Sequence, residues 1–212
     1  MMPTTSKITI SARIEPEDRV RADFYALFAR LFFSPPDAGL LRVIGSAPLL
    51  DAEADAAALA IAWARLSAAA RVMDPQAASD EYEALFGGVG HSALSLFGSF
   101  YAAAPGTGGG PFLVELRTAL AGFGLGLREG QNVPEDHLSA VFETMRLLIQ
   151  GNATVAPRDI EEQHRFFAGF IGAWCPACCA AISANAIANF YKVVAECMNA
   201  FVAIEDESFA IA

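Results

Sequence analysis

The adjacent residues Asp136 and His137 are the first candidates for chemistry, because a carboxylate beside an imidazole is a common acid–base arrangement. They stand in the stretch Pro134-Glu135-Asp136-His137-Leu138, which is typical of a helix start. Pro suits the first helical turn, and the helix dipole favours acids there. Neighbouring residues on a helix do not face each other, so a catalytic pair is disfavoured. We expect a helix start with surface acids and a histidine that packs or contacts a ligand.

A second candidate for chemistry is the group of four cysteines, which crowd into one region: Cys175, Cys178, Cys179 and Cys197. With His164 they could supply four metal ligands, but a zinc site more often has a second Cys pair or a His pair. If Cys175 caps a helix begun by Pro176, its thiol pKa would be lowered. Small thiols that face the core of a protein in a reducing compartment are the commoner outcome. A metal- or redox-dependent protein therefore stays the alternative.

A third candidate is the segment 87–110, which contains many glycines and no Asp, Glu, Lys or Arg. A phosphate-binding loop needs a preceding strand and often a lysine, and no lysine occurs between Lys7 and Lys192. Long segments of this kind are usually functional or disordered. Because the middle of the segment, residues 96–101, is strongly apolar, we expect an ordered loop packed on helices.

The composition limits the class of protein. The chain has 212 residues, of which 54% are hydrophobic and 18% charged, and its net charge is −10. Such a chain has a large core or an apolar surface for a partner, and it is ill suited to nucleic acid. An acidic protein favours basic partners. The first residues contain no apolar run of signal-peptide length, so we expect a cytoplasmic protein with a flexible tail at residues 1–15.

The spacing of apolar residues is helical almost throughout, and no strand pattern persists. Phe24, Leu27, Phe28, Leu31 and Phe32, for example, form a stripe that we expect in the core. We predict one all-α domain of about eight to eleven helices over residues 16–212. The expected helices span roughly residues 16–33, 40–44, 51–72 (capped by Asp51), 74–86, 111–124, 134–150, 157–174 and 186–205.

One uncharged run, residues 166–191, is long enough to cross a membrane. It contains Pro176, Asn185 and Asn189, which are costly in lipid unless paired. Two buried core helices are therefore favoured over a transmembrane helix.

Four segments have a distinctive order: residues 21–32, 81–88 with 97–101, 134–138, and 162–167 with Trp174. The Phe97-Gly98-Ser99-Phe100-Tyr101 stretch is similar to a Trp-Gly-Ser-x-Tyr loop, and residues 134–137 are similar to a Pro-x-Asp-His signature. Together the segments resemble the TorD/DmsD/NarJ family of cytoplasmic chaperones for molybdenum-cofactor oxidoreductases.

The resemblance implies an all-helical chaperone domain without enzymatic activity or cofactor. Such a protein binds the signal peptide, often a twin-arginine leader, or a terminal segment of the oxidoreductase catalytic subunit. It thereby prevents premature export and assists cofactor insertion. A monomer and a dimer with swapped helices both remain open.

A leader of this kind joins an arginine pair to an apolar stretch, so an apolar groove with acids at one end would suit it. Glu135, Asp136 or Glu81 could meet the arginines. The expected peptide-binding residues are Tyr82, Phe86, Leu96, Phe97, Gly98, Ser99, Tyr101, Pro134, Glu135, Asp136, His137 and Trp174.

Overall fold

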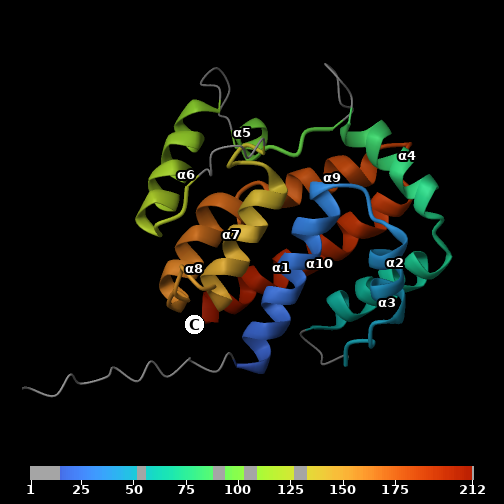
Figure 1. Cartoon of the computed structure of the whole chain (residues 1–212), viewed down its shortest axis with the longest axis horizontal. Coiled ribbons are helices and arrows are strands. Elements are labelled where there is room, and N and C mark those ends of the chain that lie inside the picture. Colours follow the sequence, from blue (N-terminus) through green and yellow to red (C-terminus); the bar gives the residue numbers. More distant parts are fainter. Residues whose placement is uncertain (1–14, 52–55, 88–93, 103–108, 127–132, 212) are drawn as a thin grey trace, which may run out of the picture.

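The computed structural model describes residues 15–51, 56–87, 94–102, 109–126 and 133–211, and there it is all-α, as predicted (Figure 1). The expected N-terminal tail lies outside these residues, apart from Glu15. In chain order the helices are α1 (Pro16–Phe33), α2 (Ala38–Ser46), α3 (Ala57–Val72), α4 (Pro75–Phe86), α5 (Gly98–Tyr101), α6 (Gly110–Gly122), α7 (Leu138–Gln150), α8 (Ile160–Phe167), the π-helix η2 (Ala168–Gly172), α9 (Cys175–Ala184) and α10 (Phe190–Ile211).

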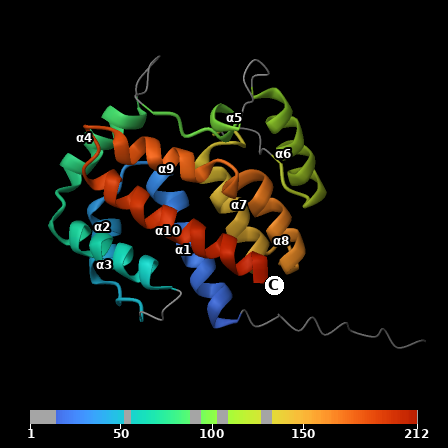
Figure 2. The ribbon, with the colours of Figure 1, turned by 180° about the vertical axis from the view of Figure 1, so that it is seen from behind.

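Helix α1 runs through the middle of the molecule between α7 and α10. It packs along α7, while α10 lies on its other side, behind α1 in Figure 1 and in front of it in Figure 2, and also packs on α9 and α3. The predicted stripe of α1 is buried except for the half-buried Leu27. Phe201 of α10 lies 5.1 Å from Phe24 and 4.9 Å from Tyr25 between ring centroids, and Phe142 of α7 lies 5.4 Å from Tyr25. Aromatic side chains therefore fill the space between the three helices.

Two buried carboxylates tie distant parts of the chain together. Glu205 of α10 accepts hydrogen bonds from Arg21 at 2.7 and 3.0 Å and from the Tyr25 hydroxyl at 2.9 Å. Glu81 of α4 accepts the backbone N–H groups of Asn189, Phe190 and Tyr191 at 2.8 to 3.0 Å. Glu81 thus caps the N-terminus of α10, where unpaired N–H groups attract a negative charge.

The predicted helix starts at Pro16 and Asp74 are confirmed, because α1 begins at Pro16 and Asp74 caps α4. Other starts lie further along the chain than predicted: the helices expected from residues 157 and 186 begin at Ile160, after an Asp159 cap, and at Phe190. Asp51 does not cap α3, which begins at Ala57 after an N-cap at Ala56. Pro134 does not open α7, because its N-cap is His137 in an extended conformation.

The predicted helix 157–174 is divided into α8 and η2, and the last helix reaches Ile211 rather than ending near residue 205. The expected ordered loop of residues 87–110 is described only in part. Its described middle includes the short helix α5, and residues 88–93 and 103–108 lie outside the described residues.

Candidate functional site

The apolar part of the Gly-rich segment lies against the start of α7. Phe97 and His137 form an isolated antiparallel bridge. The Gly98 N–H donates to the Asp136 carbonyl at 2.8 Å, and the Leu138 N–H donates to the Leu96 carbonyl at 2.8 Å. Two segments that resemble family signatures and lie far apart in the sequence therefore form one local structure.

Asp136 is part of this structure rather than a surface acid. Only 3% of the residue is exposed, and its carboxylate accepts the Ser99 N–H, in the first turn of α5, at 3.2 Å. The expectation of surface acids in the first turn of α7 is therefore wrong for Asp136. The extended bridge at His137 delays the start of α7 to Leu138, and Asp136 turns inward to α5.

His137 caps α7 and anchors the loop. Its Nδ1 accepts the Ser139 N–H at 3.2 Å and lies 2.7 Å from the Ser139 hydroxyl. Its ring packs edge-on against the Phe97 ring, with 5.3 Å between centroids. Burial lowers the pKa of His137 below its usual value, and the charge of Asp136 partly opposes this. The neutral ring can accept the capping hydrogen bond, whereas the protonated ring cannot.

Glu135 is the acid of this stretch that faces a cavity. Its side chain is only 11% exposed, and it is paired with Arg117 of α6, whose side chain is 58% exposed. The two N···O distances are 3.0 and 3.4 Å. The hydrogen bond from Arg117 lowers the pKa of Glu135 below its usual range, so the carboxylate is charged at neutral pH.

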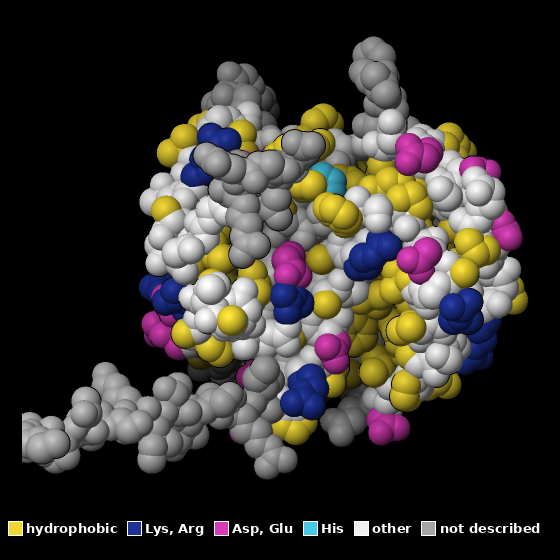
Figure 3. All heavy atoms as spheres, viewed as in Figure 1, with side chains coloured by type: hydrophobic (Ala, Val, Ile, Leu, Met, Phe, Trp, Pro, Cys, Tyr) yellow, Lys and Arg dark blue, Asp and Glu magenta, His cyan; other side chains and the backbone are white. Residues whose placement is uncertain are grey.

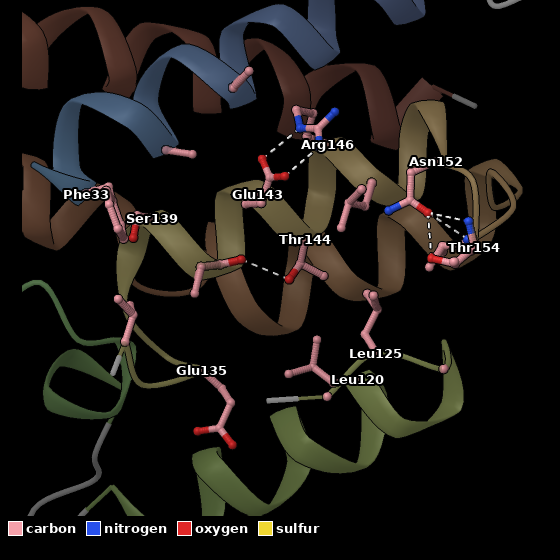
Figure 4. A pocket seen from close by; sticks show the side chains of 18 of the residues that line it. Phe33, Leu120, Leu125, Glu135, Ser139, Glu143, Thr144, Arg146, Asn152 and Thr154 are labelled. Carbon is pink, nitrogen blue, oxygen red and sulfur yellow. Dashed lines mark hydrogen bonds and ion pairs between the residues drawn. The ribbon is translucent and has the colours of Figure 1, made fainter. Parts of the chain in front are cut away.

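The cavity beside Glu135 is a groove between α1, α6 and α7 with a volume of about 1020 Å³ (Figure 4). Figure 4 shows Glu135 and Leu120 on the side of α6, with Phe33 and Ser139 across from them. A second ion pair, Glu143 with Arg146, also lines it. Its apolar lining includes Ala29, Phe33, Leu120, Leu125, Ala140, Leu147 and Val155. The size suits a few side chains of a peptide.

Several other predicted site residues form the support of the loop. Trp174 is 1% exposed and donates from its indole nitrogen to the Phe170 carbonyl at 2.6 Å. Tyr101 stacks on Trp174 with 5.8 Å between centroids, and Leu96 is buried. A Cβ on Gly98 would lie 2.8 Å from the Phe112 ring and 2.9 Å from Trp174, so only glycine fits. Of the predicted residues in the loop, Phe97 is the exposed aromatic, at 38%.

Tyr82 and Phe86 lie elsewhere; both are half-buried and pack in an aromatic cluster with the fully buried Phe32 and Tyr191. The Tyr82 hydroxyl donates to the Phe32 carbonyl at 3.1 Å. Neither Tyr82 nor Phe86 lines the groove beside Glu135. Hydrophobic side chains do gather in a hollow beside α1 on the side of α2 and α4 (Figure 3). The structure therefore divides the predicted site into a groove, a loop and a separate aromatic cluster.

Comparison with models of known protein families shows to which family the chain belongs. A family model described as nitrate reductase delta subunit matches residues 52–180, more than half of the chain. The chain belongs to this family. No curated protein matches it.

Membership in the nitrate reductase delta subunit family confirms the resemblance seen in the sequence. It implies a chaperone for molybdoenzyme maturation that binds the catalytic subunit, in a family that is not catalytic. The matched residues include α6, α7 and the described part of the loop, whereas α1 lies outside them.

The cysteines do not form the predicted alternative metal site. All four are free and buried. His164 stacks on Phe209, with 5.1 Å between ring centroids. Among the residues that the structure describes, no three His, Cys, Asp or Glu side chains come together where they could hold a metal ion.

The condition for a lowered Cys175 pKa, that Cys175 caps a helix, is not met. Trp174 is the N-cap of α9 and Cys175 its first residue. Hydrogen bonding to Cys179 and burial together raise the pKa of the Cys175 thiol well above its usual value. Burial raises the pKa of Cys178 and of Cys197 to about 12. Protonated buried thiols of this kind are poor nucleophiles.

Residues 166–184 of the long uncharged run lie in one helical stretch, Ile160–Ala184, which is long and apolar enough to cross a membrane. Half of its most apolar window is buried inside the structure. This is weak evidence for a membrane span, because core helices of soluble proteins have the same length and composition.

The sequence predictions missed most of the groove. Arg117 and the wall residues Phe33 and Leu147 were not among the expected site residues. Phe33 carries one signal in the sequence, because it follows Phe32 and does not belong to the apolar stripe of α1; in the structure it is 58% exposed. The Glu135–Arg117 pair depends on how α6 packs, which the sequence does not reveal.

Proposed function

We propose that this chain binds the leader peptide or a terminal segment of a molybdenum oxidoreductase catalytic subunit in the groove between α1, α6 and α7. It acts in the cytoplasm, prevents export of the subunit before the cofactor is installed, and assists insertion of that cofactor. The nearly buried, charged carboxylate of Glu135 at the edge of an apolar groove carries the proposal.

The chemistry of the groove selects the class of segment. Apolar walls suit an apolar stretch, because such a stretch loses contact with water when it enters. Glu135 suits a guanidinium, which pairs with a carboxylate through two parallel hydrogen bonds. The net charge of −10 favours the approach of a basic segment. A segment with arginine beside an apolar run satisfies all three features.

Phe97 extends the same surface. It is paired with His137, which lies between Glu135 and Ser139 in the chain, and both of these line the groove. Phe97 does not line the groove, but its exposed ring packs on His137, two residues from Glu135, where it can cover the apolar part of a segment that extends beyond the groove. Asp136, His137, Leu96, Gly98 and Trp174 act by holding Phe97 and Glu135 in place.

The test is a titration of the protein with a fluorescent twin-arginine leader peptide, followed by fluorescence anisotropy. We expect saturable binding that weakens severalfold in Phe97→Ala while the thermal unfolding midpoint stays within a few degrees. A matched control is Val72→Ala, since Val72 is exposed at the end of α3 and does not line the groove. Equal affinity of both variants and the wild type would contradict this placement of the site.

A further inference from the structure

The ion pair at the acidic end of the groove joins two side chains of very different exposure. The Glu135 side chain is 11% exposed, whereas that of Arg117 is 58% exposed. The guanidinium approaches the carboxylate through Nε at 3.0 Å and a terminal nitrogen at 3.4 Å. The carboxylate is therefore largely shielded from water, and the arginine reaches it from the solvent side.

Helix α6 has other attachments that hold it in place. Leu116 is fully buried, and the Phe112 ring packs against Phe170 with 5.7 Å between centroids. At its other end, Arg158 donates to the Phe123 carbonyl at 3.1 Å, and its guanidinium lies 5.3 Å from the centre of the Phe123 ring. Arg117 can therefore leave Glu135 while α6 stays docked.

We propose that Arg117 is an internal competitor that occupies the guanidinium site of Glu135 until an arginine of the bound segment replaces it. This inference rests on the proposed function, since it names how one residue of the segment is recognised. In the exchange, the incoming guanidinium forms the same pair of hydrogen bonds, and Arg117 turns into solvent. No covalent bond changes, and Glu135 stays charged and paired in both states.

Pairing with Arg117 in the free protein has a physical advantage over an unpaired Glu135 carboxylate. A nearly buried charge without a partner is costly, so the free protein is more stable with Arg117 in the site. The same pairing lowers the affinity for the segment, because each binding event must first break it. When the segment leaves, Arg117 closes the site again and thereby assists release. The fork of two hydrogen bonds also selects arginine over lysine.

The other ion pair of the groove provides a matched control. Glu143 and Arg146 lie three residues apart on α7, and the Glu143 side chain is 46% exposed. A pair within one turn of one helix does not connect two walls of the groove, and an exposed carboxylate needs no permanent partner. We therefore expect no competition from Arg146.

The experiment uses the full chain and two fluorescent peptides, one with two adjacent arginines before an apolar run and one with citrulline in place of both. Arg117→Met keeps the aliphatic stem but removes the charge. We expect it to lower the dissociation constant for the arginine peptide roughly two- to fivefold, the range of exposed ion pairs. The citrulline peptide and Arg146→Met should show no such gain. Glu135→Gln should weaken the arginine peptide and cancel the effect of Arg117→Met.

The outcomes separate the exchange from the function on which it rests. If the wild type binds the arginine peptide but Arg117→Met leaves its affinity unchanged or reduced, the exchange is wrong and the proposed function stands. If no variant binds either peptide, both are wrong. A second measurement follows the Nε–H signal of Arg117 in ¹⁵N-arginine-labelled protein. That signal must shift when the peptide saturates the protein, and an unmoved signal overturns the exchange.

Discussion

Two nearly buried glutamates beside helix starts have different partners. Glu81 is 9% exposed and accepts three backbone N–H groups at the N-terminus of α10. Glu135 precedes α7, has an 11% exposed side chain, and pairs with the exposed Arg117. The partners of Glu81 can leave only if α10 unwinds, whereas the partner of Glu135 can leave by rotating a side chain.

This difference separates an acid that stabilises the fold from an acid that is available to a ligand. Both were candidates to meet arginines on sequence grounds, and both are largely hidden from water. Burial alone therefore does not identify the binding acid. In the proposed exchange, the distinguishing feature is the freedom of the partner side chain, because the partner must be replaced without a loss of structure.

The largest expected effect on stability comes from removing Glu81, the carboxylate that caps α10. Glu81→Ala leaves three N–H groups without their acceptor and should lower the free energy of unfolding by about 2–4 kcal/mol. Guanidinium denaturation followed by circular dichroism measures this. Glu83→Ala, an exposed position on the same helix, is the control. Equal losses in the two variants would contradict the capping role.

The next effect concerns the loop that holds the α7 start. Gly98→Ala places a methyl group 2.8 Å from the Phe112 ring, and the overpacking should lower the free energy of unfolding by about 1–3 kcal/mol. Gly122→Ala is the control, because nothing lies within 4 Å of its added Cβ. If calorimetry finds no difference between these variants, the loop is not packed as described.

A smaller effect should depend on pH. His137 caps α7 in its neutral form, and its pKa in the folded protein is lower than usual. As the pH is lowered, His137 is therefore protonated in the unfolded chain before it is protonated in the folded protein. The contribution of the cap to the free energy of unfolding is complete above about pH 6.5 and is lost as the pH falls below that value. Its size is about 1 kcal/mol, as for other N-caps. Relative to wild type, His137→Asn should gain stability as the pH is lowered, and a constant difference would count against the cap.

The smallest effect on stability should come from Glu135→Gln. We expect its denaturation midpoint to shift much less than that of Glu81→Ala, because Gln keeps the shape and Arg117 is already solvated. In contrast, Glu135→Gln should lose more affinity for an arginine peptide than Glu81→Ala does. If Glu135→Gln unfolds the protein as readily as Glu81→Ala does, the distinction between the two glutamates fails.

The sequence predicted those parts of the fold that local chemistry determines. Asp74 before Pro75 marks a helix start through its own side chain, and α1 begins at Pro16 as predicted. The α7 start was misplaced because His137 pairs with Phe97, a contact that forms only when distant segments meet. Helix propensities describe each residue by itself and do not include contacts between distant segments.

The site was predictable only in outline. Glu135 and Phe97 were predicted through the family resemblance; in the structure Glu135 lines the groove and Phe97 is an exposed aromatic of the neighbouring loop. The groove itself requires three helices to pack with a space between them. Likewise, the capping role of Glu81 depends on residues more than 100 positions away in the chain.

The most direct test of the central claim is site-specific photocrosslinking in cells that express a molybdenum oxidoreductase. Benzoylphenylalanine replaces Phe33, at the groove wall and 58% exposed, or Val72, at the end of α3 and 85% exposed. If the groove between α1, α6 and α7 holds the client, position 33 will crosslink to the leader or a terminal segment of the catalytic subunit, and position 72 will not. Crosslinks to that subunit from position 72 and none from position 33 would contradict the account.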